Sequence, residues 1–234
     1  MKSAKNTSIV DLKVSCLTAI RSRQSIRQFL TMPVPVETVR AILDDAKWAP
    51  SGTNTQPWRV VVVTGETKKQ LSDALLDLRQ QNAPSSPDYF YYPQNWREPY
   101  LSRRRECGLA LYQSIHIEKH EIEKRLVAWN RNYTFFDAPV GLIFFIEKKL
   151  EKGSWLDCGM FIQNVMLAAM GHGLGTCPQA SIAEYPDTVR NVLNVSNDWH
   201  VICGMALGYP DFSAEINQYR TSRVEVDEFT SWMD

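Results

Sequence analysis

Three short apolar segments constrain the fold of this chain more than any other feature. Continuous runs rich in β-branched or aromatic residues are typical of strands buried inside a sheet. Each run is far shorter than the about 20 residues that cross a membrane as a helix, so we expect strands and no membrane partner. The three runs are Arg59–Thr64 (RVVVVT), which we expect to be buried on both faces, Val140–Ile146 (VGLIFFI) and Val201–Leu207 (VICGMAL).

The segments between these runs carry apolar residues at helical spacing. Trp155–Met170 is apolar almost all round, so we expect this helix in the centre of the fold. Gly171–Pro178 predicts a turn and a short strand. Strands that alternate with helices indicate an α/β or α+β sandwich, whose strand order the spacing does not determine. The other expected helices are Ile9–Ala19, Val36–Trp48, Thr67–Arg79, Ser102–Ala128 and Ala183–Leu193.

Composition excludes several classes of protein. The 234 residues are 44% hydrophobic and 22% charged, which is typical of one globular domain spanning 1–234 and not of a disordered chain. Lys plus Arg equals Asp plus Glu at 26 each, so a nucleic-acid partner is not expected. The five cysteines include no CxxC pair, and the N-terminus has no apolar signal segment. Both features predict a cytoplasmic protein without a zinc ribbon or a disulfide framework.

Arginines gather around one serine where the first helix is expected to end. Arg21, Arg23 and Arg27 flank Ser25 within the segment RSRQSIRQF. Guanidinium groups and a hydroxyl suit a phosphate dianion, because they offer charge-assisted hydrogen bonds. On spacing alone, a solvated cationic helix end explains the same pattern.

Two loops are rich in small or hydrogen-bonding residues. Ala49–Trp58 (APSGTNTQPW) suits close approach to a planar ligand, although an ordinary turn has the same composition. Gly171–Ser181 (GHGLGTCPQAS) matches no nucleotide fingerprint, and Cys177 has no histidine at a catalytic spacing. His116 and His120 lack the Glu of a zinc-binding HExxH segment, so no metal site is expected. The sequence has no GxSxG or equivalent motif, so no protein nucleophile is expected.

The segment Asn82–Pro99 is a long polar and aromatic loop at the start of a lid-like insertion over 82–128. Loops of this length are usually functional or disordered. Phe90 and Tyr92 would point the same way in extended backbone, and their rings could stack on an aromatic substrate. A surface loop with no ligand contact is the alternative.

Taken in order, RSRQSIRQF, APSGTNTQPW, GLGTCPQAS and LGYPD resemble the FMN-dependent nitroreductase family. The Pro after Cys177 and the RTSR tail are similar to its nitrobenzoate and nitroaromatic reductase branch. The resemblance implies an α+β fold, a nitroreductase-like sandwich with a central, mostly antiparallel sheet flanked by helices. It also implies a homodimer with two FMN sites at the interface.

The resemblance also assigns cofactor contacts. The first segment would hold the phosphate, ribityl chain and pyrimidine edge of FMN. The second would reach the flavin bound mainly by the partner chain, and a third pair would approach the flavin N5 edge. Arg223 would bind phosphate with help from Arg220, and Arg131 and Asn132 match a further flavin contact loosely. The residues of these three segments are Arg23, Gln24, Ser25 and Arg27; Pro50, Ser51, Gly52, Asn54 and Gln56; and Ala180 and Ser181.

The implied activity is reduction of nitroaromatic, quinone or related acceptors by NADH or NADPH in a ping-pong flavin mechanism. Enone reduction, dehalogenation, flavin destruction and non-catalytic flavin binding stay open as alternatives. The tail 211–234 would embrace the partner, because Val224 and Val226 alternate with polar residues like a half-buried strand that needs an edge. In the resembling family this strand is exchanged between subunits.

Overall fold

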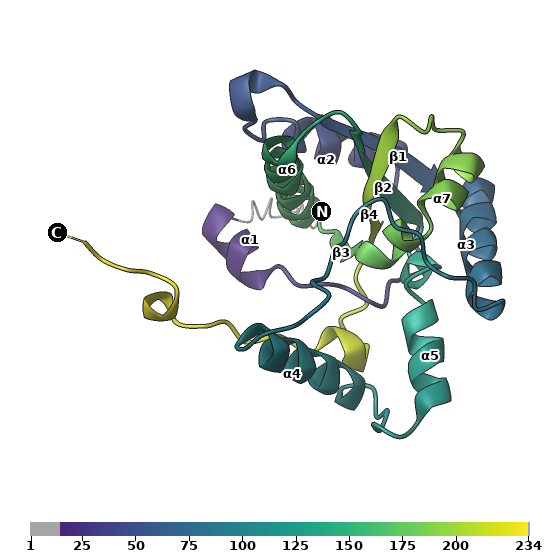
Figure 1. Cartoon of the computed structure of the whole chain (residues 1–234), viewed down its shortest axis with the longest axis vertical. Coiled ribbons are helices and arrows are strands. Elements are labelled where there is room, and N and C mark those ends of the chain that lie inside the picture. Colours follow the sequence, from purple (N-terminus) through teal and green to yellow (C-terminus); the bar gives the residue numbers. More distant parts are fainter. Residues whose placement is uncertain (1–14, 234) are drawn as a thin grey trace, which may run out of the picture.

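The structure is a computed structural model that describes residues 15–233. Its centre is an antiparallel sheet in the order β1-β2-β4-β3, drawn in Figure 1. This arrangement confirms the predicted α+β class with an antiparallel sheet. The strands are β1 (Trp58–Thr64), β2 (Val140–Glu147), β3 (Gly175–Gln179) and β4 (Trp199–Gly208).

Helices cover both faces of the sheet (Figure 1). On one face α2 (Val36–Ala46) packs against α6 (Lys152–Gly171), and on the other α3 (Gly65–Gln80) packs against α7 (Pro186–Leu193). Strand β2 alternates between the two layers. Leu142, Phe144 and Ile146 enter the α2/α6 core, whereas Ile143 and Phe145 enter the α3/α7 core. A strand with cores on both faces explains the continuous run VGLIFFI.

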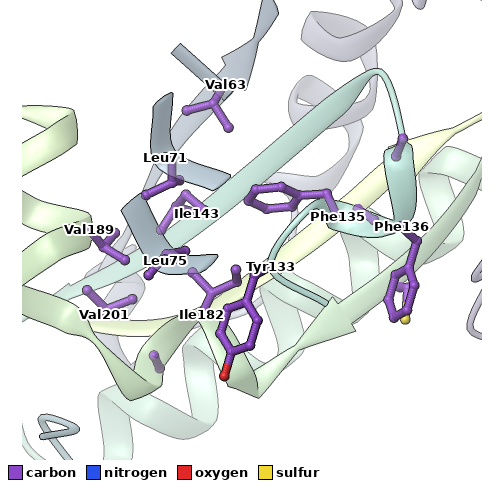
Figure 2. Close-up of a cluster of buried hydrophobic side chains, with 14 of the residues drawn as sticks. Val63, Leu71, Leu75, Tyr133, Phe135, Phe136, Ile143, Ile182, Val189 and Val201 are labelled. Carbon is purple, nitrogen blue, oxygen red and sulfur yellow. The ribbon is translucent and has the colours of Figure 1, made fainter. Parts of the chain in front are cut away.

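Figure 2 shows the α3/α7 core. Leu71 and Leu75 of α3 and Val189 of α7 lie against Ile143 and Val201 from the central strands. The sheet packs closely at Gly141, where a Cβ would lie 2.8 Å from the Val63 side chain and 2.9 Å from the Phe135 ring. Only glycine therefore fits at this position without moving packed side chains. Phe135 belongs to a short 3-10 helix, η2 (Phe135–Asp137).

Two predictions of complete burial are wrong. Strand β1 lies at the sheet edge, so Val62 is 42% exposed. Helix α6 buries only one face, through Cys158, Phe161 and Val165, while Leu156 is 72% exposed. An apolar helix surface therefore remains open in the single chain.

The predicted helix over Ser102–Ala128 is two helices, α4 (Tyr100–Gln113) and α5 (Ile122–Asn130), with turns between them. Neither has a buried residue, and both project from the sheet (Figure 1). The predicted helix Ala183–Leu193 is a 3-10 helix, η3 (Ala180–Glu184), followed by α7, because Pro186 starts a new helix.

The chain ends also differ from prediction. The first helix is α1 (Cys16–Ser22), capped by Ser15, and the rest of the predicted helix Ile9–Ala19 lies outside the described residues. The tail forms one 3-10 turn, η4 (Glu215–Asn217), beside the body and then extends away from it, with a second turn, η5 (Val226–Glu228), in the extended part (Figure 1). In the single chain a capping box between Glu225 and Glu228 closes a turn here, and the strand that would be exchanged with a partner stays a prediction.

Within residues 15–233, no helix is long and apolar enough to cross a membrane. The same residues contain no group of three or more His, Cys, Asp or Glu side chains that could hold a metal ion. His116 instead lies 3.1 Å from the Glu215 carboxylate on the surface.

Candidate flavin site

The segment after α1 lies against the edge of β3. Ile26 N–H donates to the Thr176 carbonyl at 2.9 Å, and Ser25 and Thr176 form a parallel bridge. Ile26 and Phe29 are buried, and they anchor the segment to the core. The half-buried side chains of Arg23, Ser25 and Arg27 are thereby carried on backbone fixed to the sheet.

Asn217 ties the C-terminal tail to this segment. It is 2% exposed. Its Oδ1 accepts from Arg27 N–H at 2.8 Å, and its Nδ2 donates to the carbonyls of Gln28 at 2.7 Å and Asp211 at 2.8 Å. Gln24 Nε2 donates to the Asn217 carbonyl at 2.6 Å. These bonds fix the start of the tail beside the first segment.

The tail brings two more arginines to the same place. Arg220 Nη2 donates to the Arg21 carbonyl at 2.6 Å. Burial lowers the pKa of Arg23, and the charges of Arg223 and Arg220 lower it further. We call Arg23, Arg27, Arg220 and Arg223 the arginine group. Within residues 15–233, none of the four is in an ion pair with a carboxylate.

A cavity of about 950 Å³ is lined by one member of the arginine group, Arg27. This volume lies in the range of small-molecule and cofactor sites. Two buried polar atoms on its wall, Ser181 Oγ and Gln179 Oε1, have no hydrogen-bond partner within residues 15–233. Unpartnered buried polar atoms are uncommon and point to a ligand that would satisfy them. Of the predicted residues, the lining includes Arg27, Tyr92, Arg131, Asn132, Ala180 and Ser181.

Arg131 and Asn132 are held in place on this wall. Arg131 Nη2 donates to Gln28 Oε1 at 2.8 Å, and Gln179 Nε2 donates to the Asn132 carbonyl at 2.5 Å. These bonds connect the residues after α5 with the first segment and with the end of β3. Arg131 and Asn132 thus line the same cavity as Arg27, Ala180 and Ser181.

The second predicted segment is not brought to the arginine group in this chain. Pro50, Gly52, Asn54 and Gln56 are exposed around the 3-10 helix η1 (Gly52–Asn54), and none lines the cavity. Gly52 N–H donates to Asp157 Oδ2 at 3.2 Å, which fixes the loop to the start of α6. Ser51 Oγ accepts from Gln56 N–H at 3.0 Å. The loop is therefore shaped by its own bonds and presented outward.

The long loop contributes a different pair of rings from the predicted one. Tyr91 and Tyr92 line the cavity, whereas Phe90 does not and is 77% exposed. Sequence reasoning also missed Gln28, Gln179 and Asn217. Gln179 lies inside the segment GLGTCPQAS and could have been singled out there, but no local pattern marks Asn217.

Cys177 lies in surroundings that favour the neutral thiol. Its side chain is buried beside Ser25, and burial raises the pKa of the thiol despite the charge of Arg27. A raised thiol pKa leaves the neutral, weakly nucleophilic form. The site therefore has the donors and volume for an anionic ligand.

Asn217→Ala tests the link between the tail and the first segment. The substitution leaves Arg27 N–H and two carbonyls without their partners, so we expect a loss of about 1–3 kcal/mol in the free energy of unfolding. We also expect faster tryptic cleavage after Arg220, because the tail is no longer tied down. Urea unfolding and mass spectrometry of the digest measure both effects. Gln218→Ala, which removes only a 3.5 Å bond to Ser213, is the control, and equal effects in both variants would contradict the link.

Comparison with known proteins identifies the family of this chain. A sequence model of the nitroreductase family matches residues 20–209. The chain is 42% identical to the chloronitrobenzene nitroreductase of Comamonas testosteroni, covering 92% of this chain and 95% of the relative. It is 39% identical to a 4-nitrobenzoate reductase of Pseudomonas putida, covering 92% and 93%.

The fold of the chain is also similar to that of a solved nitroreductase structure. The FMN- and NADPH-dependent nitroreductase NfnB of Sphigopyxis sp. strain HMH superposes with a TM-score of 0.92 at 36% identity, covering 94% of this chain and 99% of that one. The sequence match, the antiparallel sandwich and the cavity beside the arginine group agree. The chain belongs to the nitroreductase family.

Proposed function

We propose that this protein is an FMN-dependent oxidoreductase that uses NADH or NADPH to reduce nitroaromatic, quinone or related acceptors. The observation that carries the proposal is the arginine group, whose charges are unpaired within residues 15–233 beside a cavity of about 950 Å³. An FMN phosphate carries the negative charge that would pair with these arginines. The relatives named for chloronitrobenzene and 4-nitrobenzoate support the acceptor class.

The residues present fit FMN. Arg23 and Arg223 would hold the phosphate with Arg27, Arg220 and the Ser25 hydroxyl. Ser181 Oγ and Gln179 Oε1, both buried and unpartnered within the described chain, would meet the polar edge of a planar ring. Bound FMN would supply the redox chemistry by accepting hydride from NAD(P)H and then passing electrons to the acceptor.

The protein's own contribution is binding, orientation and exclusion of water. Tyr91 and Tyr92 stand at the cavity wall, where their rings can stack on a nicotinamide or on an aromatic acceptor. Since one cavity serves both, reductant and acceptor would bind in turn, as a ping-pong mechanism requires. No protein nucleophile is needed, in agreement with the raised pKa of Cys177.

The activity test is spectroscopic. The purified protein should be yellow, should bleach under anaerobic conditions with NADH or NADPH, and should regain its colour with nitrobenzoate or a quinone. Colour without bleaching would favour a non-catalytic flavin-binding protein. Failure to bind added FMN would overturn the proposal.

Arg23→Ala and Arg223→Ala should each weaken FMN binding. Loss of one charge-assisted hydrogen bond corresponds to about 1.5–3 kcal/mol, or roughly 10–150-fold in Kd. Fluorescence titration of the apoprotein measures Kd. Arg40→Ala, an exposed arginine on α2, is the matched control for the loss of one positive charge. Unchanged Kd in both site variants would remove the phosphate site.

We further propose that the protein works as a homodimer in the cytoplasm. The Gly52–Gln56 loop is exposed, and so are apolar side chains of α1 and α6. The exposed fractions of these side chains are 65% for Leu17, 51% for Ile20, 72% for Leu156 and 39% for Met160. A second copy that covers this surface could receive the loop at its own flavin. The five cysteines are free, which suits a reducing compartment.

Removing residues 224–234 tests the embracing tail. The truncated chain keeps Asn217, Arg220 and Arg223, so the arginine group stays complete. If Val226, Phe229 and Trp232, all more than half exposed, pack on a partner, their loss should shift the protein from dimer to monomer in light scattering. A truncated chain that stays dimeric at the same concentration would show that the tail is not exchanged.

A further inference from the structure

The segment 82–99 is anchored at its root by a buried ion pair. Arg190 of α7 and Asp88 have side chains only 3% and 9% exposed. Arg190 Nη1 donates to Asp88 Oδ2 at 2.6 Å, and its Nη2 donates to Asp88 Oδ1 at 3.2 Å. Two parallel bonds of this kind fix orientation as well as distance.

The same carboxylate also binds the sheet. Asp88 Oδ2 accepts from Val201 N–H of β4 at 3.0 Å. Burial alone would raise the pKa of Asp88, but the hydrogen bonds from Arg190 and Val201 more than offset it, so the pKa lies below its ordinary value. The charged form is therefore the one built into the fold.

Tyr89 continues the attachment. Its hydroxyl donates to the Ile202 carbonyl at 2.5 Å, and its ring packs edge-on against Trp155 at 4.6 Å between centroids. Asp88 and Tyr89 thus join adjacent residues of the segment to adjacent residues of β4. A segment held in this way cannot swing from its root.

From Tyr89 a row of rings leads to the cavity wall. The centroid distances are 6.4 Å from Tyr89 to Tyr91, 4.7 Å from Tyr91 to Tyr92 and 5.7 Å from Tyr92 to Trp96. Arg104 of α4 lies over the last two rings, 5.7 Å from Tyr92 and 5.1 Å from Trp96. Figure 1 shows the segment running from α3 to α4. The rings that line the cavity are therefore held from both sides.

We propose that Asp88 is a positioning residue, which acts through Tyr89 to hold Tyr91 and Tyr92 as a fixed wall of the substrate cavity. The expected change in acceptor KM rests on the proposed function, whereas the fixed position of Tyr91 and Tyr92 does not. The segment 82–99 would then be a fixed wall of the cavity and not a mobile lid, because the ion pair Asp88–Arg190 sets its position. Acceptors would be selected by the fixed distance between this wall and the flavin.

Asp88→Asn breaks the anchor with little change in volume. An NH₂ group at the Oδ1 position would face the donor Arg190 Nη2, and one bond would be lost. At the Oδ2 position it would face the donors Arg190 Nη1 and Val201 N–H, and two would be lost. Asp187→Asn is the matched control. Asp187 also accepts from Arg190, at 2.6 Å, but its side chain is 75% exposed, and within residues 15–233 it makes no hydrogen bond to the segment.

The first readout is chymotryptic cleavage of the FMN-loaded protein after Phe90 and Tyr91, followed by mass spectrometry. We expect faster cleavage in Asp88→Asn and an unchanged rate in Asp187→Asn. The second readout is steady-state kinetics with nitrobenzoate. Loss of an ordered aromatic contact of about 0.5–1.5 kcal/mol predicts a rise in acceptor KM of about two- to tenfold, with kcat and FMN content unchanged.

Tyr89→Phe provides a second variant if Asp88→Asn does not fold. It removes only the hydroxyl bond to Ile202 and should accelerate the same cleavage to a smaller extent. Lower melting temperature in Asp88→Asn without faster cleavage and without a change in KM would show a purely structural ion pair and overturn the inference. A protein without reductase activity would refute the proposed function, while the cleavage rates would still decide whether Asp88 fixes the wall.

Discussion

Repulsion among neighbouring guanidinium groups is the interaction around which the site is organised. Arg23, Arg220 and Arg223 lie close enough for the last two to lower the pKa of the first. Like charges separate unless something holds them, and here Asn217 holds the tail to the first segment through bonds to Arg27, Gln28 and Asp211. The fold thus uses neutral hydrogen bonds to keep positive charges together, and an anion is the natural counterpart of that arrangement.

How much could be predicted depended on whether the relevant residues are neighbours in sequence. Arg23, Ser25 and Arg27 share one chemistry within five positions, so the pattern itself suggested an anion site. Arg220 and Arg223 were reached only through the family resemblance. The role of Asn217 could not be predicted, because its side-chain bonds to the first segment join residues about 190 positions apart.

The wrong predictions about the fold also arise because a local sequence pattern does not show which surface packs against a segment. Apolar residues all round α6 indicate that its faces avoid water, but not whether this chain or another covers them. The break between α4 and α5 carries no proline or glycine to mark it. In the tail, the alternation over four residues predicts a strand that needs a partner's edge, and in the single chain the same residues form the turn that the capping box of Glu225 and Glu228 closes. The core strands β2 and β4 were predicted well because their burial depends on composition alone.

The bond between Asp88 and Arg190 also bears on the order in which the molecule is built. It closes a loop of 102 residues, within which β2, α6 and β3 all lie. Loop closure over such a distance is entropically unfavourable until the intervening elements are in place. The cavity wall is therefore expected to form late in folding, after the sandwich that supports it. Cofactor capture would then follow assembly of the scaffold, and a flavin-free chain could already possess a native core.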